Sequence, residues 1–240
     1  MPSLIQSQVQ NALLSGMTPD DFQLLRPHLE PFPLQLRVQL EYPNKTITHV
    51  HFIESGLASV MALAGDRQLE VGIVGKEGMT ALAVVMGSEK GPHANFIQAP
   101  GQSYRAPASA IRHAMQQSPT LSALFINYAH YFMIQAAYTG LSAGQADVEE
   151  RLSRWLLMSQ DRLGDDLPLT HDFLALMLGI RRAGVTEALK ALAARGFVEP
   201  GRGHIIVLDR AGMRAFVDEL YGVPEAEYVR LTGCKSHSAG

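Results

Sequence analysis

The chain has 240 residues, and its 20 lysines and arginines against 23 aspartates and glutamates give a formal net charge of −3 at pH 7. Hydrophobic residues make up 47% and charged residues 18%, which is typical of a globular protein and excludes a disordered chain. No apolar run approaches the ~20 residues of a membrane span. A single cysteine, Cys234, excludes an internal disulfide and an iron–sulfur cluster held by several thiolates.

The length predicts two domains. The first residues, MPSLIQSQVQNALLSGM, contain no basic leader followed by a signal-like apolar run, so we expect a cytoplasmic protein with no membrane partner. Short helices are predicted at residues 6–14 and 19–29. The second has Thr18 as its cap and Pro19 at its first position.

Residues 34–107 carry short, β-prone runs separated by turn residues, which predicts a β-sandwich or barrel. The predicted strands lie at residues 46–53, 57–63, 69–74, 95–98 and 102–106. The predicted turns lie at residues 43–44, 54–56, 65–66, 75–78 and 99–101.

One turn, within residues 71–79 (VGIVGKEGM), is a candidate ligand site. Glycine-rich turns can direct backbone N–H groups at a phosphate, and a lysine would add charge. The alternative is that the glycines only make tight turns. The candidate effector-binding residues are Lys76, Glu77, Gly78 and Met79.

A short helix is predicted at residues 107–117, and a long one follows from the cap Ser118 to about Ala143. Its apolar residues occupy more than one face, so it must bury two sides. Both sides could lie within one domain, or one could face a second copy of the chain. The candidate dimer-interface residues are Leu121, Phe125, Tyr128, Phe132 and Gln135. Residues 140–144 are expected to form a hinge.

Residues 170–192 predict two short helices joined at Gly179, which can end a helix in the left-handed conformation. The second starts near Arg181, and its spacing buries Val185, Ala188, Leu189 and Leu192. The positions left outward are Ala183, Thr186, Glu187 and Lys190. A helix that starts with two arginines suits the major groove, because arginine can bond guanine bidentately. The alternative is an ordinary helical hairpin in an all-α protein.

A β-hairpin is predicted next, from residues 197–199 and 204–208 joined by Pro200-Gly201-Arg202-Gly203. An arginine at the tip could touch DNA phosphates. Residues 181–214 hold seven cations and three anions, a local charge of +4. The cations are Arg181, Arg182, Lys190, Arg195, Arg202, Arg210 and Arg214, and the anions are Glu187, Glu199 and Asp209.

The stretch LTHDFLALMLGIRRAGVTEALKALAARGFVEPGRGHIIVLDRAGM resembles the winged helix-turn-helix of the Crp/Fnr family of bacterial transcription regulators. VEERLSRWLLMSQDRL is similar to the helix that opens that domain, and HVHFIESGLASV to early strands of the family's cyclic-nucleotide-binding-like roll. The resemblance covers residues 10–230. It implies an α+β protein with an N-terminal β-roll (jelly-roll) domain, a long dimerisation helix and a C-terminal winged helix-turn-helix domain.

The implied units are a sensor domain at residues 1–117, the long helix and hinge at 118–145, the winged domain at 146–223 and a C-terminal tail at 224–240. The implied function is a dimeric, sequence-specific regulator that binds double-stranded DNA at a pseudo-palindromic operator, with RNA polymerase as a further partner. The implied DNA-binding residues are Thr170, His171, Arg181, Arg182, Thr186, Glu187, Lys190, Arg202 and His204.

The sequence departs from the family in two places. Ala183 and Gly184 replace the family's glutamate and threonine, so its common operator is not expected. No arginine stands in Gly91-Pro92-His93-Ala94-Asn95 to hold a phosphate. We therefore expect an effector other than a cyclic nucleotide, or none. The competing interpretation is an effector-binding module whose main role is not DNA binding.

Catalytic motifs are absent from the sequence: it has no G-x-S-x-G elbow, phosphate-binding G-x-x-x-x-G-K-S/T loop, H-E-x-x-H helix or C-x-x-C pair. His49 and His51 could share one strand face as metal ligands, but no third ligand is evident, and surface or packed histidines are favoured. We expect no enzyme activity, metal or cofactor.

Overall fold

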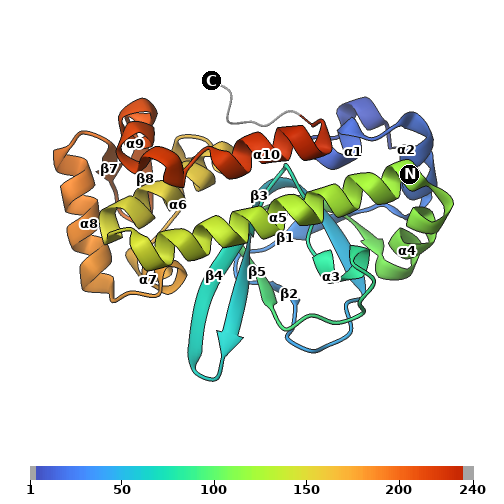
Figure 1. Ribbon diagram of the computed structural model, residues 1–240, viewed down its shortest axis with the longest axis horizontal. Coiled ribbons are helices and arrows are strands. Elements are labelled where there is room, and N and C mark those ends of the chain that lie inside the picture. Colours follow the sequence, from blue (N-terminus) through green and yellow to red (C-terminus); the bar gives the residue numbers. More distant parts are fainter. Residues whose placement is uncertain (1–3, 235–240) are drawn as a thin grey trace.

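The structure is a computed structural model that describes residues 4–234 (Figure 1). An antiparallel β domain lies toward one end, the long helix α5 (Pro119–Gln145) crosses the molecule, and a mostly helical domain lies at the other end. This is the mixed α and β architecture that the sequence predicts. None of the helices in residues 4–234 is both long enough and apolar enough to cross a membrane.

The N-terminal domain consists of η1 (Gln6–Gln8), α1 (Ala12–Gly16), α2 (Pro19–Leu25), η2 (Arg26–His28), β1 (Glu30–Leu34), β2 (Gln39–Glu41), β3 (His49–Ala64), β4 (Arg67–Val74), α3 (Leu82–Val85), β5 (Ala94–Pro107) and α4 (Ala108–Gln117). The C-terminal half consists of α6 (Val148–Leu163), β6 (Asp166–Leu167), α7 (His171–Leu178), α8 (Arg182–Ala194), β7 (Val198–Pro200), β8 (Ile205–Val207), α9 (Arg210–Val217), η3 (Asp218–Leu220) and α10 (Val223–Thr232).

The main sheet has the order β1-β5-β3-β4, with β2 also paired to β5, and its pairs are antiparallel. Two predicted turns, at residues 54–56 and 99–101, are instead irregularities inside the long strands β3 and β5, where the register between them shifts. Gly56 has φ 88°, and a Cβ on Gly101 would lie 2.0 Å from the carbonyl oxygen of Ser55. The glycines therefore allow two strands to bend together, which a sequence pattern does not distinguish from a turn.

Helix α5 packs one side against the β domain. Phe125 lies 5.8 Å from Phe52 between ring centroids, and Gln135 accepts the backbone N–H of Ile73 at 2.7 Å. The side chains predicted to face a second copy are all buried within their own chain, with exposed fractions of 0% for all but one and 7% for Phe132; they are Leu121, Phe125, Tyr128, Phe132 and Gln135. This side of α5 is therefore not open to a second copy in this conformation.

The C-terminal domain is docked on the β domain through a shared apolar cluster. Leu57, Met61 and Ile73 of the β domain pack with residues that include Trp155 of α6 and Met177 of α7. The residues predicted as a hinge, 140–144, lie inside α5. The break falls later, where Asp147 caps α6 and accepts the N–H of Glu150. The capping side chain, more than the glycines, decides where the chain turns.

The segment expected as a C-terminal tail contains helix α10, which lies alongside α5 (Figure 1). Cys234 is buried and free, and the rest of that segment, residues 235–240, lies outside the described residues. The sequence analysis did not predict this helix, and only its packing partner selects which of its apolar residues are buried: Tyr228 is buried and Val229 is exposed.

Candidate nucleic-acid interface

Helices α7 and α8 form the helix-turn-helix that the sequence predicts. Thr170 caps α7 and accepts the N–H of Phe173 at 3.3 Å, and Gly179 ends it with φ 62°. The turn then leads to Arg181, the N-cap residue of α8, whose side chain makes no capping hydrogen bond. Val185, Ala188, Leu189 and Leu192 are buried as predicted, so they fix which side of α8 faces away from the protein.

The opposite side of α8 carries polar and charged residues at the end of the molecule (Figure 1). Arg182 is paired with Asp172 at 3.3 Å, and both side chains are mostly exposed. Lys190 is similarly paired with Glu187 at 3.0 Å. Exposed pairs of this kind contribute roughly 0–1 kcal/mol each, so either cation can exchange its carboxylate for a DNA group at small cost.

Two further predicted DNA-binding residues lie beside this surface. His171 is half-buried, and its Nδ1 lies 3.0 Å from the hydroxyl of Thr186. Thr186 also donates to the backbone carbonyl of Arg182 at 3.1 Å. These contacts hold the first turn of α8 against the start of α7.

The β-hairpin predicted after α8 is formed by β7 and β8, and we call it the wing. The short strand β6 adds to it, which gives a three-stranded sheet in the order β6-β8-β7. Its tip exposes Arg202 between Gly201 and Gly203. His204 is only half-buried and pairs with Asp166 at 3.0 Å, which fastens the wing to the short strand β6. A Cβ on Gly201 would lie 1.9 Å from the ring of His204, so a side chain at this position would displace the histidine.

Not all of the predicted positive charge reaches this surface. Arg210 binds Asp161 at 2.7 Å and the hydroxyl of Tyr221 at 2.8 Å inside the domain. Arg195 pairs with Glu149 at 3.3 Å and lies 4.7 Å above the ring of Phe216. Besides Arg195, which is exposed but engaged in these contacts, the exposed cations at α8 and the wing tip are Arg181, Arg182, Lys190 and Arg202. The local charge of +4 therefore overstates what a DNA backbone would meet.

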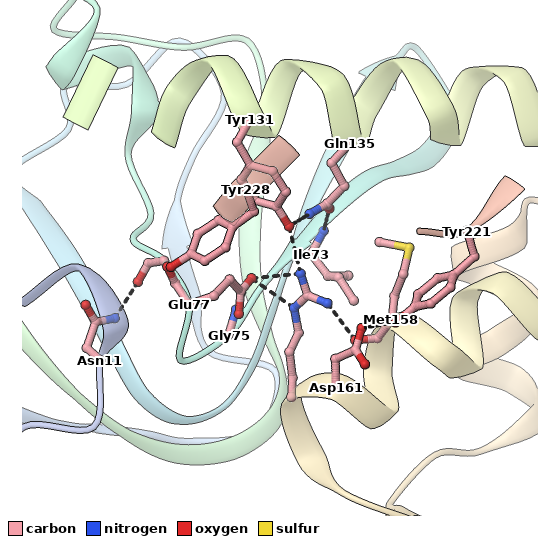
Figure 2. Close-up of polar contacts among 12 residues, drawn as sticks. Asn11, Ile73, Gly75, Glu77, Tyr131, Gln135, Met158, Asp161, Tyr221 and Tyr228 are labelled. Atoms are coloured by element: carbon pink, nitrogen blue, oxygen red, sulfur yellow. Dashed lines mark hydrogen bonds and ion pairs between the residues drawn. The ribbon is translucent and has the colours of Figure 1, made fainter. Parts of the chain in front are cut away.

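The glycine-rich loop predicted to bind an effector binds the protein's own helices (Figure 2). Glu77 is buried; its Oε1 accepts the N–H of Gly75 at 3.1 Å and pairs with Arg162 of α6 at 2.8 Å. A Cβ added to any of three glycines in this region would come within 2.7 Å or less of a helix side chain. The Cβ of Gly72 would meet Phe132 and Gln135, that of Gly75 would meet Arg162, and that of Gly78 would meet Tyr128. These glycines make room for α5 and α6. The buried cation Arg162, 85 residues downstream in sequence, gave no sequence signal as the partner of this loop.

A pocket of about 430 Å³ lies elsewhere in the N-terminal domain, between the strands, α3 and α5. Met79 lines it, but Lys76, Glu77 and Gly78 do not. Glu41 lines it too, and burial raises the pKa of this carboxyl to about 7. The remaining lining residues include both small apolar and exposed polar side chains.

Asn95 is the most informative residue of this pocket. It is 1% exposed, and neither its side-chain oxygen nor its nitrogen has a hydrogen-bond partner among the described residues. A buried amide of this kind costs roughly 1–3 kcal/mol when left without partners. No arginine lines the pocket in the described part of the chain, and its lysine, Lys90, is exposed.

The predicted histidine pair is divided between two environments. His51 is buried, stacks edge-on against Phe32 at 4.9 Å, and has its pKa lowered to about 3 by burial and by nearby Arg105. His49 is half-buried beside Thr48. His51 is thus a neutral packed histidine.

The C-terminal domain is thus a winged helix-turn-helix that follows a long helix and packs on an antiparallel β domain. Residues 150–216 match the Crp-like helix-turn-helix domain. Residues 150–216 are therefore a domain of that kind, and the chain as a whole has the fold of Crp/Fnr transcription regulators. No curated protein matches the chain.

Solved structures support the same fold. FixK2 from Bradyrhizobium japonicum has a TM-score of 0.68 at 15% identity and covers 78% of this chain and 96% of its own. A protein from Eubacterium rectale described as a transcriptional regulator of the Crp/Fnr family has a TM-score of 0.66 at 18% identity. The match covers 87% of this chain and 98% of the other. The c-di-GMP-responsive regulator CLP from Xanthomonas campestris has a TM-score of 0.63 at 16% identity. The match covers 80% of this chain and 100% of the other.

Proposed function

We propose that this protein is a dimeric, sequence-specific DNA-binding transcription regulator. The observation that carries the proposal is the outward side of α8, which exposes Arg181 and Arg182 at a helix start without a capping side chain. The start of a helix that no side chain caps suits a phosphate, and the guanidinium groups suit guanine in the major groove. Arg202 at the wing tip suits a neighbouring phosphate.

Selection from a random duplex library tests this proposal. A dimer should enrich a symmetric motif with half-sites about one helical turn, roughly 34 Å, apart. Because Ala183 and Gly184 replace the residues usual in the family, we expect a motif that differs from the family's common operator. Enrichment of no symmetric motif would contradict the proposal and favour an effector-binding module without a DNA role.

The dimer seam that we propose lies on the exposed side of α5. Exposed residues recur there at alternating intervals of three and four, the period of a coiled-coil seam; they are Ala123, Ile126, His130, Met133, Ala137, Gly140 and Gly144. Leu141 is exposed beside them. Met133 is 62% exposed and Ile126 is 51% exposed. Exposed apolar side chains in such a row favour burial against a second copy.

Sedimentation of two variants tests this seam. Met133→Lys should give folded monomers, because the ammonium would be buried without a partner at the seam. Met86→Lys is the matched control: Met86 is 65% exposed but lies off this helix, so the dimer should persist. Phe132→Lys should instead lose the fold, since that side chain is buried within one chain. A dimer that survives Met133→Lys would place the interface elsewhere.

For the sensor domain, we propose that the pocket near Asn95 is the effector site in place of the glycine-rich loop. Glu41 and the amide of Asn95 favour an uncharged or cationic ligand over a phosphate, which lacks a bidentate cation here. Operator binding should therefore be unchanged when cyclic AMP or cyclic GMP is added. A change with either nucleotide would show that the pocket holds a phosphate after all.

A further inference from the structure

The last described helix, α10, follows the C-terminal domain in sequence but packs with the N-terminal one. It begins beyond residues 150–216, which match the helix-turn-helix domain. Asp218 and Gly222 take left-handed backbone angles (φ 46° and 113°) and reverse the chain after α9. Tyr228 then joins the apolar core of the N-terminal domain and α5, and Leu231 packs against it.

The anchor of α10 is Tyr228, which is 2% exposed. Its hydroxyl donates to the backbone carbonyl of Glu77 at 2.8 Å, and its ring meets that of Tyr131 edge-on at 5.0 Å. A second bond lies farther along, where the amide of Asn127 donates to the carbonyl of Leu231 at 2.9 Å. The helix is thus held by α5 and by the glycine-rich loop, both outside the domain that it follows.

Glu77 is bound by the C-terminal half twice (Figure 2). Its carbonyl accepts from Tyr228 of α10, and its carboxylate accepts from Nε of Arg162 at 2.9 Å. Arg162 belongs to α6, the helix that opens the DNA-binding domain, and its side chain is 4% exposed. The first helix of the C-terminal domain and the helix that follows this domain therefore both bind one residue of the N-terminal domain.

Another polar contact joins α6 to the β domain. The indole N–H of Trp155 in α6 donates to Glu70 of β4, which also accepts from the hydroxyl of Ser59 at 2.5 Å. Trp155 is 5% exposed and is the single tryptophan of the chain. Its fluorescence therefore reports whether α6 stays seated on the β domain.

We propose that α10 is a C-terminal clamp that holds the DNA-binding domain against the N-terminal domain. Helix α6 precedes the helix-turn-helix in the chain, and α10 follows the C-terminal domain. Both helices are bound to Glu77. Opening the domain requires α10 to be displaced, because the tether between α9 and α10 is only the residues 218–222. That displacement regulates the orientation of α8.

The clamp leaves the proposed dimer seam open. Asn127 and Tyr131 contact α10, whereas Ile126, His130 and Met133 remain exposed on another side of α5. A second copy and the clamp can therefore occupy α5 together. The consequence for α8 rests on the proposed DNA-binding function, but the clamp itself does not.

Acrylamide quenching of Trp155 in the full-length protein tests the clamp. Tyr228→Ala should raise the quenching constant at least about twofold, because a domain that opens exposes the indole to solvent. Tyr228→Phe, which loses only the bond to Glu77, should raise it less. Arg230→Ala is the matched control on the same helix: Arg230 is exposed and pairs with Glu227, so quenching should stay unchanged.

Circular dichroism must show the helical content of the unaltered protein in each variant. If Tyr228→Ala fails to fold, Tyr228→Phe decides the matter by the same quenching measurement. Quenching at the level of the unaltered protein in every folded Tyr228 variant would overturn the clamp. Failure of the unaltered protein to bind any selected duplex would instead overturn the proposed function, and the quenching result would still judge the clamp.

Discussion

Two groups of arginines in the C-terminal half occupy opposite environments. Arg182 at the start of α8 has a side chain that is 66% exposed, whereas that of Arg162, in the same domain, is 4% exposed. Arg182 has one carboxylate partner at 3.3 Å. Arg162 is bound by Glu77, by the carbonyl of Met158 at 2.6 Å and by the hydroxyl of Tyr131 at 3.3 Å.

The difference in exposure separates an arginine that is free to contact DNA from an arginine that holds two domains together. A buried guanidinium must be compensated by fixed partners, because desolvation of an uncompensated charge is expensive. Such an arginine is bound too firmly to exchange partners with DNA. An exposed arginine holds its partner weakly and can exchange it for a base or a phosphate. Counting arginines along the chain does not distinguish these two roles.

Removal of the buried arginine should have the largest effect. Arg162→Ala leaves the carboxylate of Glu77 buried without a cation and should lower the free energy of unfolding by about 3–5 kcal/mol. Urea denaturation measures the loss. Arg182→Ala is the exposed control and should change stability by less than about 0.5 kcal/mol. Similar losses of unfolding free energy in the two variants would show that the buried and the exposed arginine do not differ in their contribution to stability.

The pH dependence of stability should come partly from Glu70, a buried carboxyl that faces Arg154 and Arg162. Burial raises its pKa from 4.5 to about 7, against the opposing hydrogen bonds of Ser59 and Trp155. A raised carboxyl pKa stabilises the fold below about pH 4.5, and that contribution is lost as pH rises through about 7. The linked change is roughly 3 kcal/mol.

Glu70→Gln should flatten this dependence between pH 4.5 and 8, measured as the free energy of unfolding at several pH values. Glu41 has a pKa raised in the same direction, so some decline with rising pH should remain. A curve identical to that of the unaltered protein would show that Glu70 is not the carboxyl responsible.

The exposed arginine of α8 should affect DNA and not stability. Arg182→Ala should cost roughly 1–3 kcal/mol in operator binding and relax the base preference at one position of each half-site. Selection with the variant and titration of the operator measure both. Arg195→Ala, at the C-cap of the same helix, is a control that should leave specificity unchanged, since this side chain pairs with Glu149 and covers Phe216. Retained specificity in Arg182→Ala would mean that another residue reads the base.

The wing arginine should have the smallest effect. Arg202→Ala should weaken binding to all sequences alike and lower the slope of log affinity against log salt by about one, because one phosphate contact is lost. Titrations at several salt concentrations measure the slope. A loss of affinity confined to one DNA sequence would show that Arg202 contacts a base and not a phosphate.

Local patterns in the sequence predicted the helix-turn-helix closely. Thr170, Gly179 and the buried positions of α8 follow from capping, left-handed backbone and helical period, which are properties of a few neighbouring residues. Ser118 likewise marks the start of α5. The DNA-binding roles assigned to these positions remain predictions.

Other features depended on residues far apart in the chain. The sequence placed an effector at Lys76, Glu77 and Gly78, but Arg162 and Tyr228 occupy that loop. It placed a hinge at residues 140–144, where α5 continues without a break. The hinge was placed by reading glycines as flexible, whereas Gly140 and Gly144 lie within a helix. In the loop, Gly75 and Gly78 are needed because other helices approach them closely. The effector-binding role of the loop remains a prediction.

The sequence by itself determined which segments form helices and strands around α8 and which side of α8 faces outward, because helical periodicity and capping act over one or two turns. Only the tertiary structure decided which side of α5 is open, where α10 lies and which arginines are buried. Those outcomes depend on the desolvation of side chains by partners many residues away, and no local spacing encodes the identity of such partners.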